Sequence, residues 1–212
     1  MPDAPSPTTP CTTAQLLDRA RAGDEAARDQ LFTTAVPPLL TYVRVRLGTK
    51  LAALVEPADV VQDTFAAALA SMAEFEPVGK GAFVAWLCRI AERQIHGLAD
   101  HFAAGKRRLP GQATPWTAIA TRLFAAGTSP GSAAARNDER QRLERALHEL
   151  PDNEREVVLL CFFEERALRD VAEASGRATT TVHRLLGRAT AHLGETLGRA
   201  LDATPRASDG AA

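Results

Sequence analysis

The chain has 212 residues, 25 of them Lys or Arg and 26 Asp or Glu. That length suffices for one ordinary domain or two small ones. No apolar run approaches the roughly 20 residues that cross a membrane, and the start, residues 1–13, lacks the basic and apolar segments of a secretion signal. We therefore expect a cytoplasmic protein. Ala, Leu and Arg dominate and aromatic residues make up only 5%, which predicts an all-α fold.

Three cysteines, Cys11, Cys88 and Cys161, are widely separated along the chain. They form no CxxC motif, and no His/Cys cluster has the spacing of zinc ligands. Cys88 and Cys161 lie among apolar residues, which is typical of buried, unreactive thiols. We therefore expect no disulfide, no metal and no cofactor.

Charge alternates in sign along the chain. Residues 51–79 contain five acidic and no basic residues, whereas 80–108 contain six basic and two acidic ones. Residues 136–165 are again acidic and 166–199 again basic. Such a pattern suits a protein that meets one partner with acidic faces and a polyanion with basic ones. Ordinary variation along solvated helices explains it equally well.

The first helical segments begin after a disordered arm, residues 1–13. Gly23 should end one helix, and Asp24 should cap the next. Pro37 and Pro38 should restart the chain, and Gly48 should close the apolar stripe that follows them.

The next helix is expected from Pro57 to about Glu74, with an apolar face and an opposite face that carries acidic and amide side chains. A loop follows at 77–81, and then a helix at about 83–102. Residues 109–138, rich in Gly, Pro, Ala, Thr and Ser, are predicted to be a linker. The organisation is thus two small helical domains, at 14–108 and 139–200, joined by a flexible linker, with a disordered tail at 201–212.

The strongest local pattern, at 168–193, indicates a helix-turn-helix. A short apolar face precedes Gly176, and Val182, Leu185 and Ala189 then line one side of a second helix. The opposite side is small, polar and basic, which lets such a helix enter the major groove of DNA. A plain helical hairpin would share the spacing and the glycine turn. The outward Thr and Arg side chains favour DNA binding, in which Arg can pair with guanine.

These segments together resemble the sigma-70 family, in its extracytoplasmic-function (ECF) group. The motif residues are Leu16–Asp24 for region 2.1, Ala58–Phe65 for region 2.2, Phe83–Ala91 for region 2.3, and Leu150–Pro151, Arg155–Val158, Asp170–Glu173, Gly176 and Thr181–Val182 for region 4. The resemblance implies an alternative sigma factor that binds core RNA polymerase and directs promoter recognition and transcription initiation. It implies no catalytic residues, because RNA synthesis belongs to polymerase.

The resemblance assigns region 2.2 to the β′ clamp helices of core polymerase. The residues that match are Asp59, Gln62, Asp63 and Phe65. An acidic and amide face suits a basic coiled coil. For Phe65 we favour packing in the core over direct contact.

Regions 2.3 and 2.4 of the family melt and bind the −10 promoter element. Here the corresponding residues are Trp86, Arg89, Arg93, Lys106, Arg107 and Arg108. Basic side chains and an aromatic platform are what single-stranded DNA requires, although Trp86 fits core packing better. The familiar Asn and Asp of region 2.4 are replaced by Arg93 and Gly97, and Asp100 interrupts the basic run.

Region 4 of the family binds the −35 element. Its counterparts here are Arg177, Thr179, Thr180, Thr181, His183, Arg184 and Arg188. The resemblance also implies a surface that faces the β flap of polymerase, formed by Glu164, Glu165 and the helix that begins at Asp152. His183-Arg184-Leu185 departs from the usual Lys-Ser-Arg, so the −35 sequence does not carry over.

Two other functions compete with this one. A stand-alone helix-turn-helix regulator explains 166–193 but leaves 58–91 unexplained. A helical adaptor that binds only protein explains the acidic faces but not the outward Thr and Arg. No nucleophile–base pair, P-loop or metal cluster indicates an enzyme. Promoter DNA and core polymerase are the expected partners; whether an anti-sigma factor is a third, the sequence leaves open.

Overall fold

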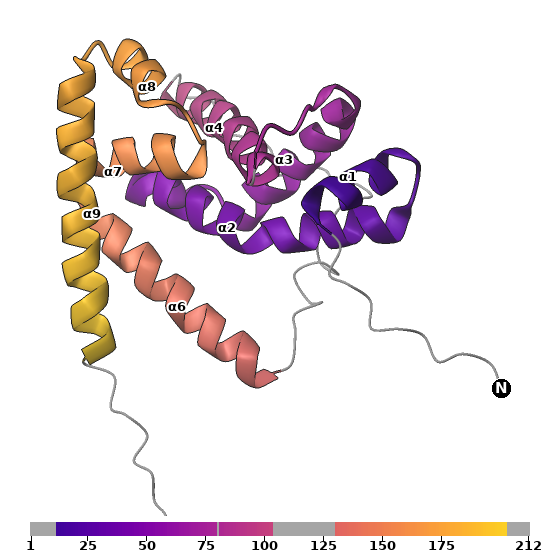
Figure 1. Ribbon diagram of the computed structural model, residues 1–212, viewed down its shortest axis with the longest axis horizontal. Helices are drawn as coiled ribbons and strands as arrows, with labels where there is room; N and C mark the ends of the chain where they lie inside the picture. Colours follow the sequence, from indigo (N-terminus) through magenta and orange to yellow (C-terminus); the bar gives the residue numbers. More distant parts are fainter. Residues whose placement is uncertain (1–11, 80, 104–129, 203–212) are drawn as a thin grey trace, which may run out of the picture. The chain divides into compact units, whose positions relative to one another are not determined.

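The computed structural model describes residues 12–79, 81–103 and 130–202, which form helices and turns with no strand among them (Figure 1). Two compact units divide the chain. Of the described residues, unit 1 comprises 12–39, 58–79 and 81–103, and unit 2 comprises 40–57 and 130–202. The predicted all-α, two-domain fold is confirmed, with the difference that residues 40–57 group with the C-terminal unit.

The first two helices, α1 (Thr13–Arg21) and α2 (Glu25–Ala52), meet at the predicted Gly23–Asp24 turn. Gly23 has a φ of 92°, a backbone conformation that glycine adopts readily. Asp24 Oδ1 accepts a hydrogen bond from the Ala27 amide at 3.0 Å, and Oδ2 accepts from the Arg19 guanidinium at 2.6 Å. Asp24 therefore caps α2, as the sequence predicts.

Capping at Asp24 predicts a pH-dependent contribution to stability. The Ala27 amide, and then Arg19, hold the pKa of Asp24 below its ordinary value of 3.8. A carboxyl whose pKa is lowered by folding stabilises the protein above pH 3.8, and that contribution is lost as the pH falls through the lowered pKa. Asp24→Asn keeps a capping side chain but not the charge. The melting temperature of the wild type should exceed that of this variant at pH 7, and the difference should shrink below pH 3.8.

Helix α2 runs through Pro37 and Pro38, so the prediction that these prolines restart the chain was wrong. A proline inside a helix costs about 3 kcal/mol or more. Burial of the neighbouring side chains offsets this cost: Val36 is 7% exposed and Leu39 is fully buried. Gly48, at φ 59° and ψ 177°, interrupts the helix where the sequence predicts its end.

Unit 1 is organised around an aromatic cluster. The first half of α2 contributes Phe32, whose ring centroid lies 4.8 Å from that of Phe65 on α3 (Pro57–Ser71) and 5.5 Å from that of Phe83 on α4 (Ala82–Ala103). A single turn of 3-10 helix, η1 (Met72–Glu74), follows α3. Thr64 is fully buried and its hydroxyl reaches Gln94 Oε1 at 2.8 Å, which links α3 to α4.

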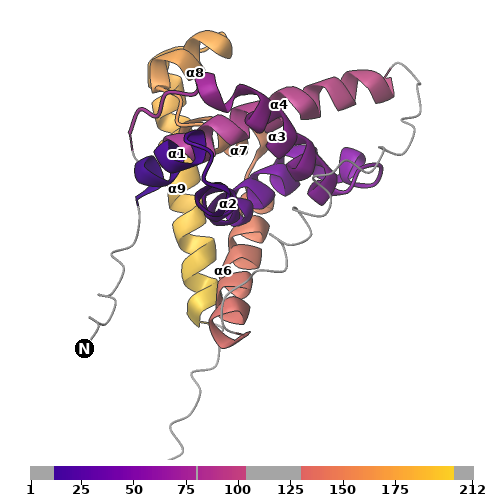
Figure 2. The same ribbon diagram turned by 90° about the vertical axis from the view of Figure 1, so that its right-hand side faces the viewer.

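Unit 2 is built on the long helix α9 (Thr179–Asp202), against which α6 (Pro130–Glu149), α7 (Asp152–Val158) and α8 (Leu168–Ala174) all pack (Figures 1 and 2). A short π-helix, η2 (Leu159–Phe163), extends α7. The apolar core between these helices is formed by Val157, Leu160, Val171, Ala172, Val182 and Leu185.

Helix α6 begins earlier than the sequence predicts. Its first residue, Pro130, lies within the expected linker at 109–138. Proline is tolerated at the first helical position because the amide it lacks would have no partner there. The remainder of that linker, up to residue 129, and the two predicted terminal segments lie outside the described residues, apart from Thr12, Thr13 and the end of α9.

Two of the cysteines lie in described segments, and both carry free thiols. Cys88 is fully buried. Cys161 is half-buried against the core of unit 2, and this burial raises the pKa of its thiol. The Cys161 thiol is therefore not favoured to ionise or react. Within the described segments, no group of His, Cys, Asp and Glu side chains is arranged to hold a metal ion.

Candidate polymerase and DNA interfaces

Helix α3 presents the acidic and amide face that the sequence predicts. Asp59 and Asp63 are exposed and Gln62 is half-buried. Phe65 points the other way: it is only 2% exposed and packs on Phe32. A side chain so buried makes no surface contact, so Phe65 supports the face from inside.

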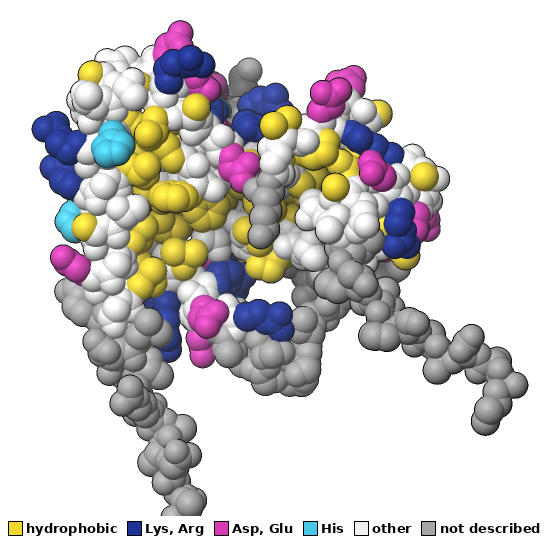
Figure 3. Space-filling model, in the orientation of Figure 1, with side chains coloured by type: hydrophobic (Ala, Val, Ile, Leu, Met, Phe, Trp, Pro, Cys, Tyr) yellow, Lys and Arg dark blue, Asp and Glu magenta, His cyan; other side chains and the backbone are white. Residues whose placement is uncertain are grey.

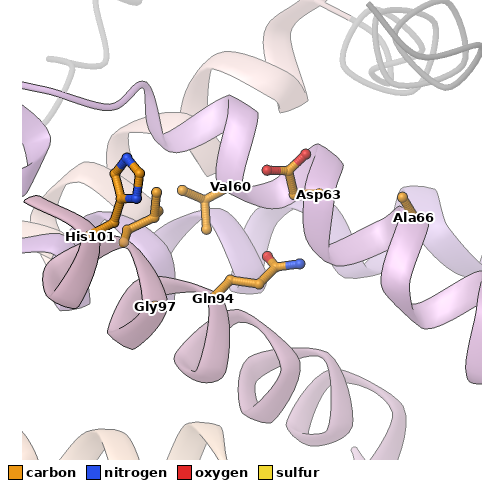
Figure 4. Close-up of a pocket in the computed structure, with 7 residues that line it drawn as sticks. Val60, Asp63, Ala66, Gln94, Gly97 and His101 are labelled. Carbon is orange, nitrogen blue, oxygen red and sulfur yellow. The ribbon is translucent and has the colours of Figure 1, made fainter. Parts of the chain in front are cut away.

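A cleft of about 490 Å³ borders this face between α3 and α4 (Figure 4). Asp63 lies on its α3 wall, and Gln94 and His101 lie on its α4 wall. The Nε2 atom of His101 is buried and has no hydrogen-bond partner. An exposed carboxylate at the edge of a concave, partly apolar surface can receive a Lys or Arg side chain whose stem packs in the cleft.

Helix α4 carries two exposed arginines, Arg89 and Arg93, which lie one helical turn apart. Trp86 is half-buried, and its ring stacks on Phe75 with centroids 4.4 Å apart. This contact favours packing over stacking on a DNA base. The last three predicted −10 residues, Lys106, Arg107 and Arg108, lie outside the described residues.

Helices α8 and α9 form the predicted helix-turn-helix. Between them, Gly176 has a φ of 63°, and the Arg177 amide donates to the Ala172 carbonyl at 2.9 Å. This hydrogen bond closes the turn after α8. Val182 and Ala189, on the inner side of α9, are fully buried, so the opposite side of the helix faces solvent.

Replacing Gly176 with Ala should destabilise unit 2. A Cβ at this position would meet no atom within 4 Å, so the change adds no clash. The left-handed conformation itself costs an L-residue about 1–2 kcal/mol. Denaturant unfolding should show a loss of this size, and Gly187→Ala, inside α9, should instead be neutral or stabilising. Equal effects at both positions would contradict the strained turn.

The outward side of α9 and the preceding turn gather the predicted −35 residues. Arg177, Thr179, Thr180, His183 and Arg184 are all exposed, and Thr181 is half-buried. Figure 3 shows basic and histidine side chains along the edge of the molecule that α9 occupies. The helix amides at this end add a partial positive charge. Such a surface can bind phosphates and hydrogen-bond to base edges.

Arg188 differs from the other −35 candidates because it has a partner within unit 2. Its Nε atom lies 3.3 Å from Glu154 Oε1, and His192 Nδ1 lies 2.8 Å from Glu154 Oε2. Glu154 itself is 3% exposed. Sequence reasoning missed this group, although Glu154 occupies the apolar stripe of α7 between Leu150 and Val157, where an acidic residue signals a buried pair.

Glu164 also has a different position from the one expected. The family resemblance implies that Glu164 faces the β flap of polymerase. Its side chain is instead fully buried. Its Oε1 atom accepts a hydrogen bond from the Tyr42 hydroxyl at 2.8 Å, and its Oε2 atom accepts from Arg166 Nε at 2.8 Å. In this conformation only its neighbour Glu165 is exposed.

Comparison with protein families finds two models that match, one for each part of the chain. Residues 31–103 match sigma-70 region 2, and residues 140–193 match sigma-70 region 4. Together these matches cover more than half of the chain. Curated relatives include the ECF RNA polymerase sigma factor SigD of Mycobacterium bovis and that of Mycobacterium tuberculosis, each 29% identical over 177 residues, or 81% of this chain and 79% of the relative.

Solved structures that are similar to this chain include CnrH and the sigma factor RpoE of Bartonella quintana. The chain is 26% identical to CnrH, solved with the cytosolic domain of CnrY, with a TM-score of 0.44 and coverage of 87% of this chain and 96% of that one. It is 21% identical to RpoE of Bartonella quintana, solved with the anti-sigma factor NepR, with a TM-score of 0.41 and coverage of 77% and 92%. Among the described helices, none is long and apolar enough to span a membrane. With regions 2 and 4 matched in order, the chain belongs to the sigma-70 family and is an alternative sigma factor of the ECF group.

Proposed function

We propose that this sigma factor divides its work among three surfaces. The α3 face, defined by Asp59, Gln62 and Asp63, binds the β′ clamp helices of core polymerase. The α4 surface at Arg89 and Arg93 binds the −10 strand. The start of α9, with the turn before it, reads the −35 element. The observation that carries the proposal is the exposed Thr and Arg surface at the start of a helix-turn-helix recognition helix.

The −35 surface consists of Arg177, Thr179, Thr180, His183 and Arg184. Threonine hydroxyls and N-terminal amides of α9 suit phosphate contacts, which fix the register of the helix. Arg184 has the length and the paired donors to read a guanine. We leave Arg188 out of the base-reading set, because Glu154 holds its guanidinium.

Neither half of the protein needs tight DNA affinity on its own. Core polymerase holds regions 2 and 4 at the spacing of the promoter elements, and the linker makes the two modest affinities act together through effective concentration. The net charge of −1 accords with weak DNA binding by the free protein. The chemistry of RNA synthesis then belongs to polymerase and not to this chain. An anti-sigma factor remains a candidate regulator of the kind solved with RpoE of Bartonella quintana.

A binding titration with core polymerase tests the α3 surface. Changing Gln62 and Asp63 together to Ala should weaken binding by at least tenfold, because a carboxylate–cation contact and an amide hydrogen bond are lost. Glu74→Ala removes one exposed charge outside this face and serves as the matched control. Equal binding by the wild type and the double variant would contradict the assignment of this face.

A further inference from the structure

The cleft between α3 and α4 brings together polar side chains from two helices of unit 1. It has a volume of about 490 Å³ and is bordered by Asp63 on α3 and by Gln94 and His101 on α4 (Figure 4). Val60 and Leu98, which are both buried, supply apolar wall between these polar groups. The two α4 residues lie outside the α3 face that the proposed function assigns to polymerase.

Thr64 fixes the side-chain amide of Gln94 in the wall of the cleft. Thr64 is fully buried, and its hydroxyl oxygen lies 2.7 Å from the Val60 carbonyl oxygen and 2.8 Å from one end of the Gln94 amide. A hydroxyl has a single hydrogen to donate, and a threonine in a helix commonly donates it to the carbonyl four residues earlier. Both contacts are hydrogen bonds only if Gln94 donates its NH2 group to the Thr64 oxygen. The amide oxygen of Gln94 is then the atom left for the cleft.

His101 adds a nitrogen atom that needs a partner. Its Nε2 atom is buried and makes no hydrogen bond within the described part of the chain. A buried polar atom without a partner is unfavourable, so such atoms are rare in folded proteins. In a neutral imidazole that carries its proton on Nδ1, Nε2 is an acceptor. A hydrogen-bond donor that enters the cleft would satisfy it.

The polar groups around the cleft all accept hydrogen bonds. They are the exposed carboxylate of Asp63, the amide oxygen of Gln94 and the ring nitrogen of His101. Asp59 lies one helical turn before Asp63 and is also exposed, so the α3 rim is acidic. A guanidinium complements this arrangement, because it is a cation with five N–H donors spread in one plane, whereas an ammonium has three donors on one atom. The apolar walls suit the stem of an arginine side chain.

The cleft is continuous with the α3 face, which identifies the source of the guanidinium. Asp63 belongs both to the cleft and to the face that binds the β′ clamp helices in the proposed function. A helix that lies along that face can place a side chain in the adjoining cleft.

We propose that the cleft receives an arginine side chain of core polymerase, and that Gln94 and His101 determine the specificity of this contact. The inference rests on the proposed function and extends its polymerase surface from α3 onto α4.

Opposite charge changes at Gln94 test the cleft, in titrations of the full-length protein with core polymerase. Gln94→Glu keeps an acceptor for the Thr64 hydroxyl and adds a negative charge, so binding should tighten by about two- to fivefold. Gln94→Lys places an ammonium where the guanidinium lies and should weaken binding by roughly tenfold or more. A purely structural role for Gln94 would make both variants bind more weakly.

Matched variants control for folding and for net charge. Gln30→Glu makes the same chemical change at an exposed position on α2, outside the cleft, and should leave the affinity unchanged. His101→Leu should weaken binding by about two- to tenfold, the loss of one hydrogen bond. His101→Gln keeps an acceptor and should bind like the wild type. Thermal melting followed by circular dichroism establishes that each variant is folded.

A double variant shows whether Asp63 and Gln94 meet the same cation. Asp63→Ala alone should weaken binding, and Gln94→Glu in addition should recover most of the loss, because the new carboxylate pairs with the same guanidinium. The inference is overturned if Gln94→Glu and Gln94→Lys change the affinity in the same direction, or if neither they nor His101→Leu changes it. Strictly additive effects of Asp63→Ala and Gln94→Glu would also overturn it.

The same titrations separate this inference from the proposed function. If Gln62→Ala with Asp63→Ala weakens binding while the Gln94 and His101 variants bind like the wild type, the α3 face is supported and the cleft is refuted. If the wild type does not bind polymerase, or if the α3 double variant binds equally well, the proposed function is refuted, and the cleft inference with it.

Discussion

Changing Arg188 and His192 together to Ala is expected to destabilise region 4 by about 3–5 kcal/mol, because it leaves a buried carboxylate without a partner. Both side chains are half exposed, whereas the side chain of Glu154 is 4% exposed. The cost therefore comes from the buried Glu154 and not from Arg188 and His192, which remain in contact with solvent. Urea unfolding followed by circular dichroism measures the loss.

The same asymmetry predicts the behaviour of the reverse change. Glu154→Gln releases Arg188 and His192 into water, where they are readily hydrated, so it should cost much less than the double alanine change. Added to the double variant, Glu154→Gln should recover most of the lost stability, since a neutral amide is easier to bury. Additive effects in the triple variant would show that Glu154 does not depend on these partners.

Arg184→Ala is expected to weaken recognition of the −35 element by about 5- to 150-fold, the loss of one bidentate arginine–guanine contact worth about 1–3 kcal/mol. Arg184 is exposed on the outer side of α9, so its removal should leave folding intact. The measurement compares holoenzyme affinity for the selected promoter and for the same promoter with each −35 base pair changed.

Two controls give this experiment its specificity. Arg145→Ala, on α6, removes an exposed arginine from the same region and should leave promoter affinity unchanged. Arg188→Ala should lower stability without relaxing discrimination at any base pair. If Arg184→Ala weakens all promoters equally, the side chain contacts phosphate rather than a base.

Much of this fold could be predicted from local sequence. Gly23 with Asp24, and Gly176 with the apolar positions of α9, are short-range signals whose physical meaning does not depend on the rest of the chain. The order of motifs likewise indicated the two family regions. The prediction that Pro37 and Pro38 would end a helix was wrong. Proline inside a helix is unfavourable, but the burial of the residues beside these two prolines outweighs that local cost.

The contacts that most alter the site could not be predicted, because they join distant parts of the chain. Tyr42 lies 122 residues from Glu164, and Arg44 lies 100 residues from Glu144. No spacing rule connects such positions. The helical periodicity of the sequence places Arg188 on the flank of the outward side of α9. Its contact with Glu154 arises only because α7 packs against α9.

Transcription with purified components tests the central claim most directly. Core RNA polymerase from the source organism is mixed with the protein and genomic DNA fragments, and the RNA 5′ ends are mapped. The account predicts discrete start sites with a shared pair of upstream elements, absent with core alone and absent with the Gln62→Ala, Asp63→Ala variant. No new start sites, together with tight binding of the free protein to a duplex, would contradict it and favour a stand-alone regulator.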